Sequence, residues 1–231
     1  MRLREKRIAL GFWLLTAVLF LGTISMLVLY TPVEPTMGPI QKIYYVHLPV
    51  AIGTFTGALL VFIAGLGYLW QRSLWWDDLA QAAGELTVLL CSVVLLTGMF
   101  WAKSAWGHWW EWSAPLTFSL VLWVLYAAAL VLRPMIHDPV RRATVAAVYG
   151  VAAFVDVPLV YTSLKLMPDR HPTSIALSPS MRLTLLAWFL PVTLMAGGLL
   201  VARFGLCRRG RALAEHADVH SHAPPTNGVC P

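Results

Sequence analysis

Residues 101–112 hold an unusual concentration of tryptophan. Five of the 11 tryptophans in the chain fall within this stretch: Trp101, Trp106, Trp109, Trp110 and Trp112. Indoles offer large flat apolar faces and one polar N–H each, which suits holding a flat, largely apolar ring system at the edge of a membrane. Gly107, in the middle, would let a ligand approach the backbone closely. Crowded packing of interfacial aromatic residues is the alternative explanation.

Two histidines, His47 and His171, each lie where an apolar run begins or ends. Imidazole is the usual axial ligand of heme iron, and two opposed imidazoles complete the two axial positions of one iron. Together with the tryptophans, this pair predicts a site for b-type heme, bound transiently and without a covalent link. His108 lies inside the tryptophan stretch and stays open as a third candidate ligand.

The two propionates of a heme need hydrogen-bond donors or cations where water is partly excluded. Basic residues in the segments around these histidines and tryptophans could meet them: Lys42, Lys103, Arg170 and Arg182. Each of the four could equally anchor a lipid headgroup.

Composition indicates which elements position these side chains. The chain has 231 residues, 58% hydrophobic and 12% charged, whereas soluble domains are about 45–50% apolar and about 25% charged. Apolar runs long enough to cross a bilayer as helices cover residues 8–29, 48–69, 80–100, 116–132, 143–164 and 183–202. We therefore predict an all-α integral membrane protein, with a bundle of six transmembrane helices in residues 1–205 and a disordered cytoplasmic tail in residues 206–231.

The distribution of basic residues predicts the orientation of the bundle. Six spans place both termini on one side, and 12 of the 17 lysines and arginines fall on that side. By the positive-inside rule, both termini are then cytoplasmic, and the tryptophan stretch and both histidines lie on the external, periplasmic face of the cytoplasmic (inner) membrane. The net charge of +6 is mostly a topology signal, and it does not indicate a nucleic-acid partner.

The cysteines and the tail histidines add little further chemistry. The three cysteines are widely spaced and contain no Cys-x-x-Cys pair, which argues against a disulfide framework and against covalently attached heme. Three histidines follow the last span: His216, His220 and His222. A metal-binding tail is the alternative to the disordered tail that we favour.

Two carboxylates fall inside apolar runs, Glu85 in the third and Asp156 in the middle of the fifth. An unpaired charge at the centre of a membrane costs roughly 2.5–3.5 kcal/mol on insertion scales. Both side chains are therefore expected to face the bundle interior, neutral or hydrogen-bonded. We interpret them as polar groups that fix helix packing, with a proton or substrate pathway as the alternative.

Three segments match a known pattern. Residues 96–117 begin with Leu-Thr-Gly-x-x-Trp, continue with Trp-Gly-x-Trp-Trp-x-Trp and end with Leu-Thr. Residues 42–49 surround His47, and residues 154–172 contain a Val-Asp-Val-Pro segment and His171. Together they resemble the tryptophan-rich, heme-handling proteins of cytochrome c assembly, and among them the heme exporter protein C (CcmC) family.

The resemblance implies that His47 and His171 are the axial ligands of heme iron. It places the other cofactor-binding residues at Trp101, Trp106, Gly107, Trp109, Trp110 and Trp112. It also implies partners: a heme chaperone, a small membrane helper subunit and the ABC-type transporter subunits of the cytochrome c maturation system. Ser113 and Pro115 stand where the family pattern has an Asp and an Arg, so both charged side chains are missing here. If these two side chains brace the loop or engage the chaperone in the family, their absence affects the handover of heme or the identity of the partner.

The predicted function is to hold heme at the external face and to deliver it to a heme chaperone. No enzymatic step is expected of this chain, because covalent attachment of heme would occur on a partner. The alternative is a heme or small-solute transporter, a permease subunit of an ABC-type complex, although the spans lack a polar stripe. An electron-transfer subunit would need histidines at mid-membrane depth, and none of the seven lies there.

Overall fold

The structure is a computed structural model that describes residues 3–166 and 177–221. Its long elements are all α-helices: α1 (Leu3–Ser25), α2 (Tyr44–Gln71), α3 (Leu74–Trp106), α4 (Ala114–Leu132), α5 (Pro139–Ala153), α6 (Asp156–Leu166) and α7 (Pro179–Ser221). Short helical turns of other types lie at Met26–Tyr30, Pro39–Ile43 and Arg133–Met135. The prediction of an all-α fold is therefore confirmed.

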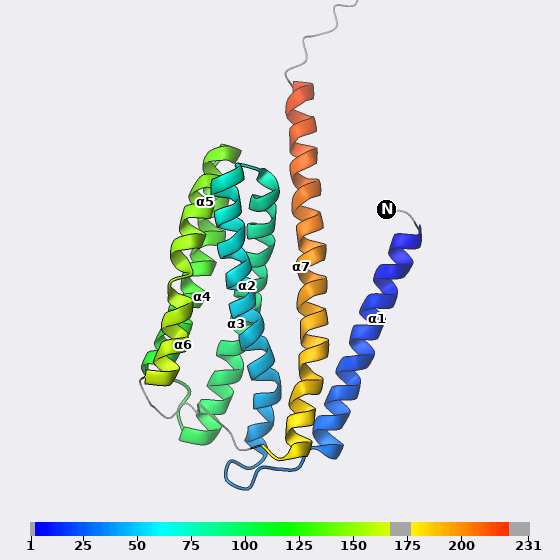
Figure 1. Cartoon of the computed structure of the whole chain (residues 1–231), viewed down its shortest axis with the longest axis vertical. Helices are drawn as coiled ribbons and strands as arrows, with labels where there is room; N and C mark the ends of the chain where they lie inside the picture. The colour runs from blue at the N-terminus through cyan, green and yellow to red at the C-terminus, as the bar shows by residue number, and fades with distance from the viewer. Residues whose placement is uncertain (1–2, 167–176, 222–231) are drawn as a thin grey trace, which may run out of the picture.

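Six stretches are long and apolar enough to cross a membrane. They are Arg4–Tyr30, Pro39–Gln71, Leu74–Trp106, Ala114–Met135, Pro139–Leu166 and Pro179–Ala214, and each contains one of the predicted apolar runs. Figure 1 shows that the start of α1 and the end of α7 lie at the same end of the bundle, which we call the terminus end. The connection from α3 to α4 lies at the opposite end, which we call the Trp end.

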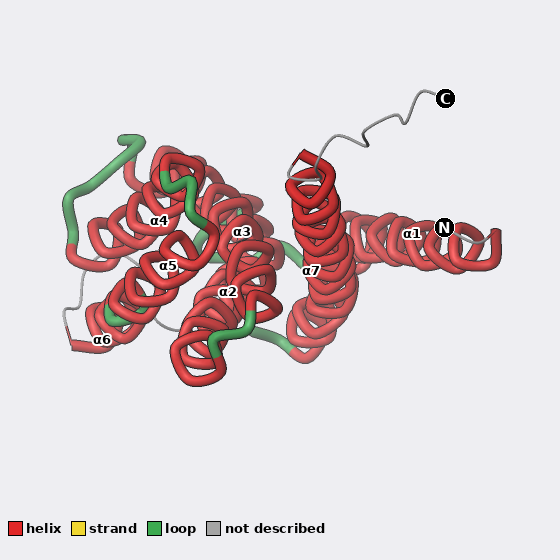
Figure 2. Tube along the Cα trace, turned by 90° about the horizontal axis from the view of Figure 1, so that it is seen from above, coloured by secondary structure: helices red, strands yellow, loops and turns green. Residues whose placement is uncertain are grey.

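The α2–α3 hairpin forms the centre of the bundle. Seen from above, it lies between α7 on one side and α4, α5 and α6 on the other (Figure 2). The two helices approach closely at Gly57, where a Cβ atom would come within 2.5 Å of the Thr87 hydroxyl oxygen. One cluster of buried side chains joins the hairpin to α7 and includes Leu90 and Trp188. Helix α1 packs mainly against α7, at the edge of the bundle.

The fifth span is interrupted between α5 and α6. Pro158 has no N–H to donate to the Phe154 carbonyl four residues earlier, and a proline ring clashes with the carbonyl at that position. The Phe154 carbonyl instead accepts a hydrogen bond from the N–H of Val157, at 3.0 Å. The apolar run at 143–164 is thus one span made of two helices, and Asp156 begins the second.

Helix α7 continues well beyond the expected end of the membrane domain. The boundary predicted at residue 205 falls inside this helix, which runs to Ser221. Residues 206–216 are rich in Leu, Arg and Ala, all strong helix formers, and this explains why the helix persists after the apolar run stops. The last ten residues of the predicted tail, 222–231, lie outside the described residues.

Candidate functional site

The tryptophan stretch is partly helical. Helix α3 extends beyond the predicted span, so Trp101 and Trp106 lie on its last turns. The helix ends at Gly107, whose φ of 84° falls in the left-handed region that glycine adopts without strain. The N–H of Gly107 donates to the Lys103 carbonyl at 3.1 Å, and the Lys103 ammonium donates to the Gly107 carbonyl at 2.8 Å. Residues 108–113 then form a non-helical loop before α4 begins.

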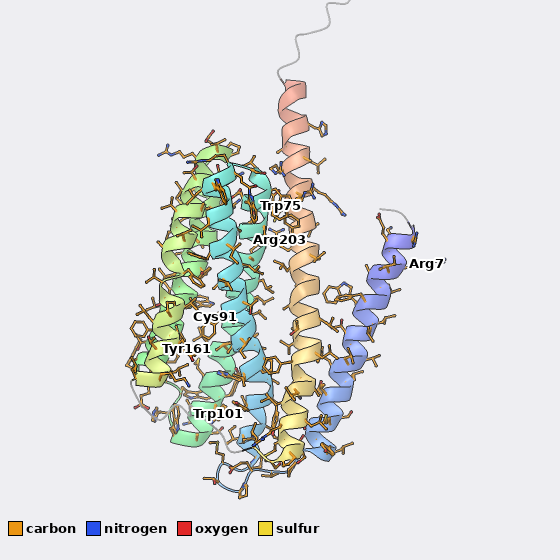
Figure 3. All side chains as sticks on the ribbon, in the orientation of Figure 1. Arg7, Trp75, Cys91, Trp101, Tyr161 and Arg203 are labelled. Atoms are coloured by element: carbon orange, nitrogen blue, oxygen red, sulfur yellow. The ribbon has the colours of Figure 1, made fainter. Side chains whose placement is uncertain are left out.

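His47 lies on the first turn of α2, against the last turns of α3. Its Nδ1 atom is 2.8 Å from the hydroxyl oxygen of Thr97. The indole of Trp101 meets the imidazole edge to face, with ring centroids 6.3 Å apart. Trp101 is itself only 8% exposed and also contacts the ring of Tyr44. Figure 3 labels Trp101 near the Trp end of the bundle. The packing of α2 on α3 therefore brings His47 and the tryptophan stretch together.

Three of the other tryptophans meet aromatic neighbours edge to face, whereas Trp106 is tilted against His108 at 39°. Trp110 and Trp112 have ring centroids 5.7 Å apart at an interplanar angle of 76°, and Trp109 meets Phe100 at 5.6 Å and 74°. Trp112 is 75% exposed and Trp109 is 49% exposed, whereas Trp106 is half-buried. These indoles thus present edges and partly open faces at the Trp end, whereas Trp101 is buried against His47 and Tyr44.

Of the two other candidate histidines, the structure describes only His108. His108 is half-exposed in the loop, and its Nε2 lies 3.5 Å from a carboxylate oxygen of Glu111. His171 lies outside the described residues. Within the described residues, no group of three or more His, Cys, Asp and Glu side chains could hold a metal ion. A heme iron with two axial histidines does not require such a group.

Two buried polar atoms in the loop have no hydrogen-bond partner among the described residues. They are the indole N–H of Trp110 and the hydroxyl group of Ser113. Buried polar groups are almost always hydrogen-bonded, so unpaired ones call for an explanation. A ligand with carboxylate groups would supply the missing acceptors, and heme is such a ligand. The residues present therefore fit heme in three respects: they offer aromatic surface for the ring, an imidazole for the iron and hydrogen-bond donors for the propionates.

The cations proposed for the propionates hold backbone carbonyls. Lys42 donates to the Leu27 carbonyl at 2.8 Å, and Arg182 donates to the Leu177 carbonyl at 3.1 Å. The Lys103 ammonium, besides its bond to Gly107, lies 5.9 Å from the centre of the Trp109 ring. An ammonium or guanidinium group has several N–H donors, so these bonds do not use up the donor capacity of any of the three. Arg170 lies outside the described residues.

Comparison of the sequence with known proteins identifies the family of the chain. A family model described as heme exporter protein C matches residues 1–219. The chain belongs to the heme exporter protein C family. Its members act in cytochrome c biogenesis and handle heme, so this membership supports the chemistry that the site residues fit.

Individual relatives carry the same family name. The chain is 32% identical to heme exporter protein C of Bradyrhizobium diazoefficiens over 71% of this chain and 63% of that protein. It is 33% identical to the Rhodobacter capsulatus protein over 48% and 46%, and 29% identical to the Escherichia coli K12 protein over 66% and 64%. In each case the match covers less than two thirds of the relative's length.

At the terminus end lie three ion pairs that were not predicted from the sequence. Three carboxylates on α3 each bind an arginine from another element: Asp77 with Arg133, Asp78 with Arg211, and Glu85 with Arg203. The signal for them was in the sequence, because α3 and α7 run antiparallel and the acidic and basic residues recur about two turns apart on each. Glu85 is thus hydrogen-bonded, as expected of a carboxylate in an apolar run.

Asp156 is the other carboxylate inside an apolar run. It is 4% exposed, and its Oδ2 atom has no hydrogen-bond partner among the described residues. The hydroxyl group of Tyr126 is likewise buried and unpaired there. Tyr126 lines a cavity of about 40 Å³ between α2, α3, α4 and α5. A cavity of that size has room for a few water molecules.

Proposed function

We propose that this chain binds heme at the Trp end, between His47 and His171, and presents it to a heme chaperone. The observation that carries the proposal is the cluster of His47, Thr97 and Trp101. It places a candidate iron ligand on α2 directly against the helix that carries the tryptophan stretch. Membership of the heme exporter protein C family supports heme as the bound molecule.

Each residue of the site would have a distinct task. When bound, heme supplies an iron with two axial positions, and His47 and His171 would fill them with imidazole nitrogens. The exposed indoles of Trp109 and Trp112 would cover the apolar ring edges, with Trp106 and Trp110 beside them. The unpaired donors of Trp110 and Ser113 would bind propionate oxygens.

The orientation and the partners belong to the same proposal. The bias of Lys and Arg toward the terminus end supports cytoplasmic termini and an external Trp end. The partners that the resemblance implies are a heme chaperone, a small membrane helper subunit and ABC-type transporter subunits. In this scheme the chain positions heme for its acceptor, and any covalent attachment takes place on a partner.

The interior of the bundle supports a permease function less well than the Trp end supports heme binding. The cavity between α2, α3, α4 and α5 contains Arg133, Gln81 and Tyr126, so it has polar groups that a solute pathway would use. Its volume of about 40 Å³ is far too small for heme. Binding at the Trp end therefore accounts for more of the described residues than passage through the bundle does.

Visible spectroscopy tests the proposed function. Detergent-solubilised protein is purified with heme available, and oxidised and reduced spectra are recorded for wild type, His47→Gly, His171→Gly and His108→Ala. We expect a six-coordinate low-spin spectrum that is lost in both glycine variants and kept in His108→Ala. Added imidazole should restore the spectrum of a glycine variant that has folded, because it can occupy the space of the missing ring. Wild-type spectra in both glycine variants, or no heme bound by wild type, would refute the proposal.

A further inference from the structure

The hydroxyl group of Thr97 has three close polar neighbours. Its oxygen lies 2.7 Å from the Val93 carbonyl oxygen, 3.1 Å from the Val94 carbonyl oxygen and 2.8 Å from Nδ1 of His47. The first two contacts are within α3, where a threonine hydroxyl commonly donates to the carbonyl one turn earlier. The third crosses from α3 to α2.

Counting protons decides the direction of the bond between the helices. A hydroxyl group has one hydrogen to donate and lone pairs with which to accept. Carbonyl oxygens can only accept, so the hydrogen of Thr97 must point to the Val93 or Val94 carbonyl to avoid two facing acceptors. The bond to His47 must then run the other way, with Nδ1–H of His47 donating to the oxygen of Thr97.

We propose that Thr97 is a positioning residue that fixes His47 in its Nδ1–H form and thereby directs Nε2 to heme iron. The inference rests on the proposed function for the identity of the metal, but the hydrogen bond itself does not depend on it. In a neutral imidazole with hydrogen on Nδ1, the metal-binding lone pair is on Nε2. Ligating histidines generally donate their other N–H to a fixed acceptor, which sets ring orientation and ligand basicity.

The surroundings of the ring support this role. Trp101 lies one helical turn beyond Thr97, and its indole meets the His47 imidazole at an interplanar angle of 78°. Two residues of α3 therefore limit the rotation of the imidazole. Gly98 lies between them, and a Cβ atom there would come within 3.6 Å of Cε1, the carbon between the two ring nitrogens. The face of α3 next to the imidazole is therefore built from a hydrogen-bond acceptor, an open position and an aromatic edge.

The proton position can be measured without heme. Protein labelled with ¹³C and ¹⁵N in histidine is studied by NMR at about pH 8, where an ordinary imidazole is neutral, and His47→Gln identifies the His47 signals. We expect the Nδ1–H form in wild type and in Thr97→Ser, which keeps the hydroxyl group. Thr97→Val should shift His47 toward the Nε2–H form that free histidine prefers. The matched control is Thr87→Val, because Thr87 makes the same bond one turn back, to the Ala83 carbonyl.

Two results would overturn the inference. One is an Nε2–H form of His47 in wild type, and the other is an Nδ1–H form that survives in Thr97→Val. Heme titration gives the second measurement, in which Thr97→Val should weaken binding about 10- to 100-fold and raise the reduction potential, with both restored in Thr97→Ser. If wild type has the Nδ1–H form but binds no heme, the assignment of Nε2 to iron fails together with the proposed function.

Discussion

The Oε1 atom of Glu85 on α3 lies 2.7 Å from Nη2 of Arg203 on α7, and Nε of Arg203 donates to the other carboxylate oxygen. Gln81 donates to Glu85 at 3.2 Å, one turn earlier. Toward the terminus end, Arg211 donates to Asp78 at 2.8 Å. Two ion pairs therefore join α7 to α3 in the half of the bundle that lies far from the candidate heme site.

Removing one member of the pair between Glu85 and Arg203 should destabilise the bundle. In Glu85→Gln, the guanidinium of Arg203 keeps its charge but loses its counterion within an apolar span. Because both side chains are partly exposed, we expect the free energy of unfolding to fall by about 1–2 kcal/mol, between the values for surface and buried pairs. Thermal unfolding in detergent, followed by tryptophan fluorescence, measures this change.

A double-mutant cycle separates this pair from general effects of substitution. The variant Glu85→Gln with Arg203→Gln should lose less stability than the sum of the two single variants. Arg209→Gln, at an exposed position of the same helix, is the control and should unfold like wild type. Additive losses in the cycle would mean that the two side chains do not stabilise one another.

The pair between Asp77 and Arg133 should be more sensitive to geometry. Arg133 donates through both terminal nitrogens to the two oxygens of Asp77, at 2.8 and 2.5 Å, and both side chains are largely buried. Lysine keeps the charge but cannot make two parallel bonds. Arg203 also donates two bonds to Glu85, but that pair is more exposed, so we expect Arg133→Lys to lower the midpoint of thermal unfolding more than Arg203→Lys does. An equal or smaller effect would contradict the importance of burial for the paired bonds.

The six spans could be predicted because a bilayer requires long apolar helices, and the sequence contains six such runs. Helix ends were harder to predict. Polarity marked residue 205 as a boundary, whereas local helix propensity carries α7 to Ser221. An interruption of the fifth span could be expected near Pro158, because proline has no N–H to donate. The break lies at Phe154, because the Phe154 carbonyl is the one that would have accepted the missing hydrogen bond from residue 158.

The candidate site was predictable to a different degree. His47 and the tryptophan stretch both lie at the same end of neighbouring antiparallel spans, so their proximity followed from topology. Thr97 stands in the Leu-Thr-Gly part of the matched pattern, but nothing in the sequence indicated a contact with His47, because a threonine in an apolar run usually bonds only to its own helix, as Thr87 does. Its contact with His47 depends on the rotation of α3 about its axis, which periodicity alone does not fix.

Gly98 should tolerate a methyl group but not a larger side chain. A Cβ atom at 3.6 Å from Cε1 of His47 is in ordinary van der Waals contact, so Gly98→Ala should bind heme like wild type. The branched side chain of Gly98→Leu would extend beside the ring and displace it from Thr97, and we expect heme affinity to fall at least tenfold. Heme titration with both variants makes the comparison. Similar affinity in the two would show that this face of the ring is not confined.

Trp101 and Trp112 should have separable effects on stability and on heme binding. Trp101 is buried against His47 and Tyr44, so Trp101→Ala should cost about 3–5 kcal/mol in unfolding free energy, as in other aromatic truncations in cores. Trp112 is largely exposed, so Trp112→Ala should unfold like wild type and yet bind heme more weakly. Trp70→Ala, also highly exposed but at the terminus end, is the control for both measurements. A loss of stability in Trp112→Ala would indicate packing rather than ligand contact.

The unpaired donors of the loop give the sharpest test of how propionates are bound. Trp110→Phe keeps an aromatic ring, although a smaller one, and removes the indole N–H, which has no acceptor among the described residues. Without heme, the loss of ring contacts and the removal of a costly unpaired donor act in opposite directions, so the variant should unfold close to the wild-type temperature. With heme, a lost hydrogen bond to a carboxylate is worth about 1.5–3 kcal/mol, so affinity should fall roughly 10- to 100-fold. Heme dimethyl ester keeps carbonyl acceptors but lacks the negative charge of the propionates, so the difference in affinity between Trp110→Phe and wild type should become smaller. A difference of the same size with the ester would place the effect of Trp110 on the ring instead of the propionates.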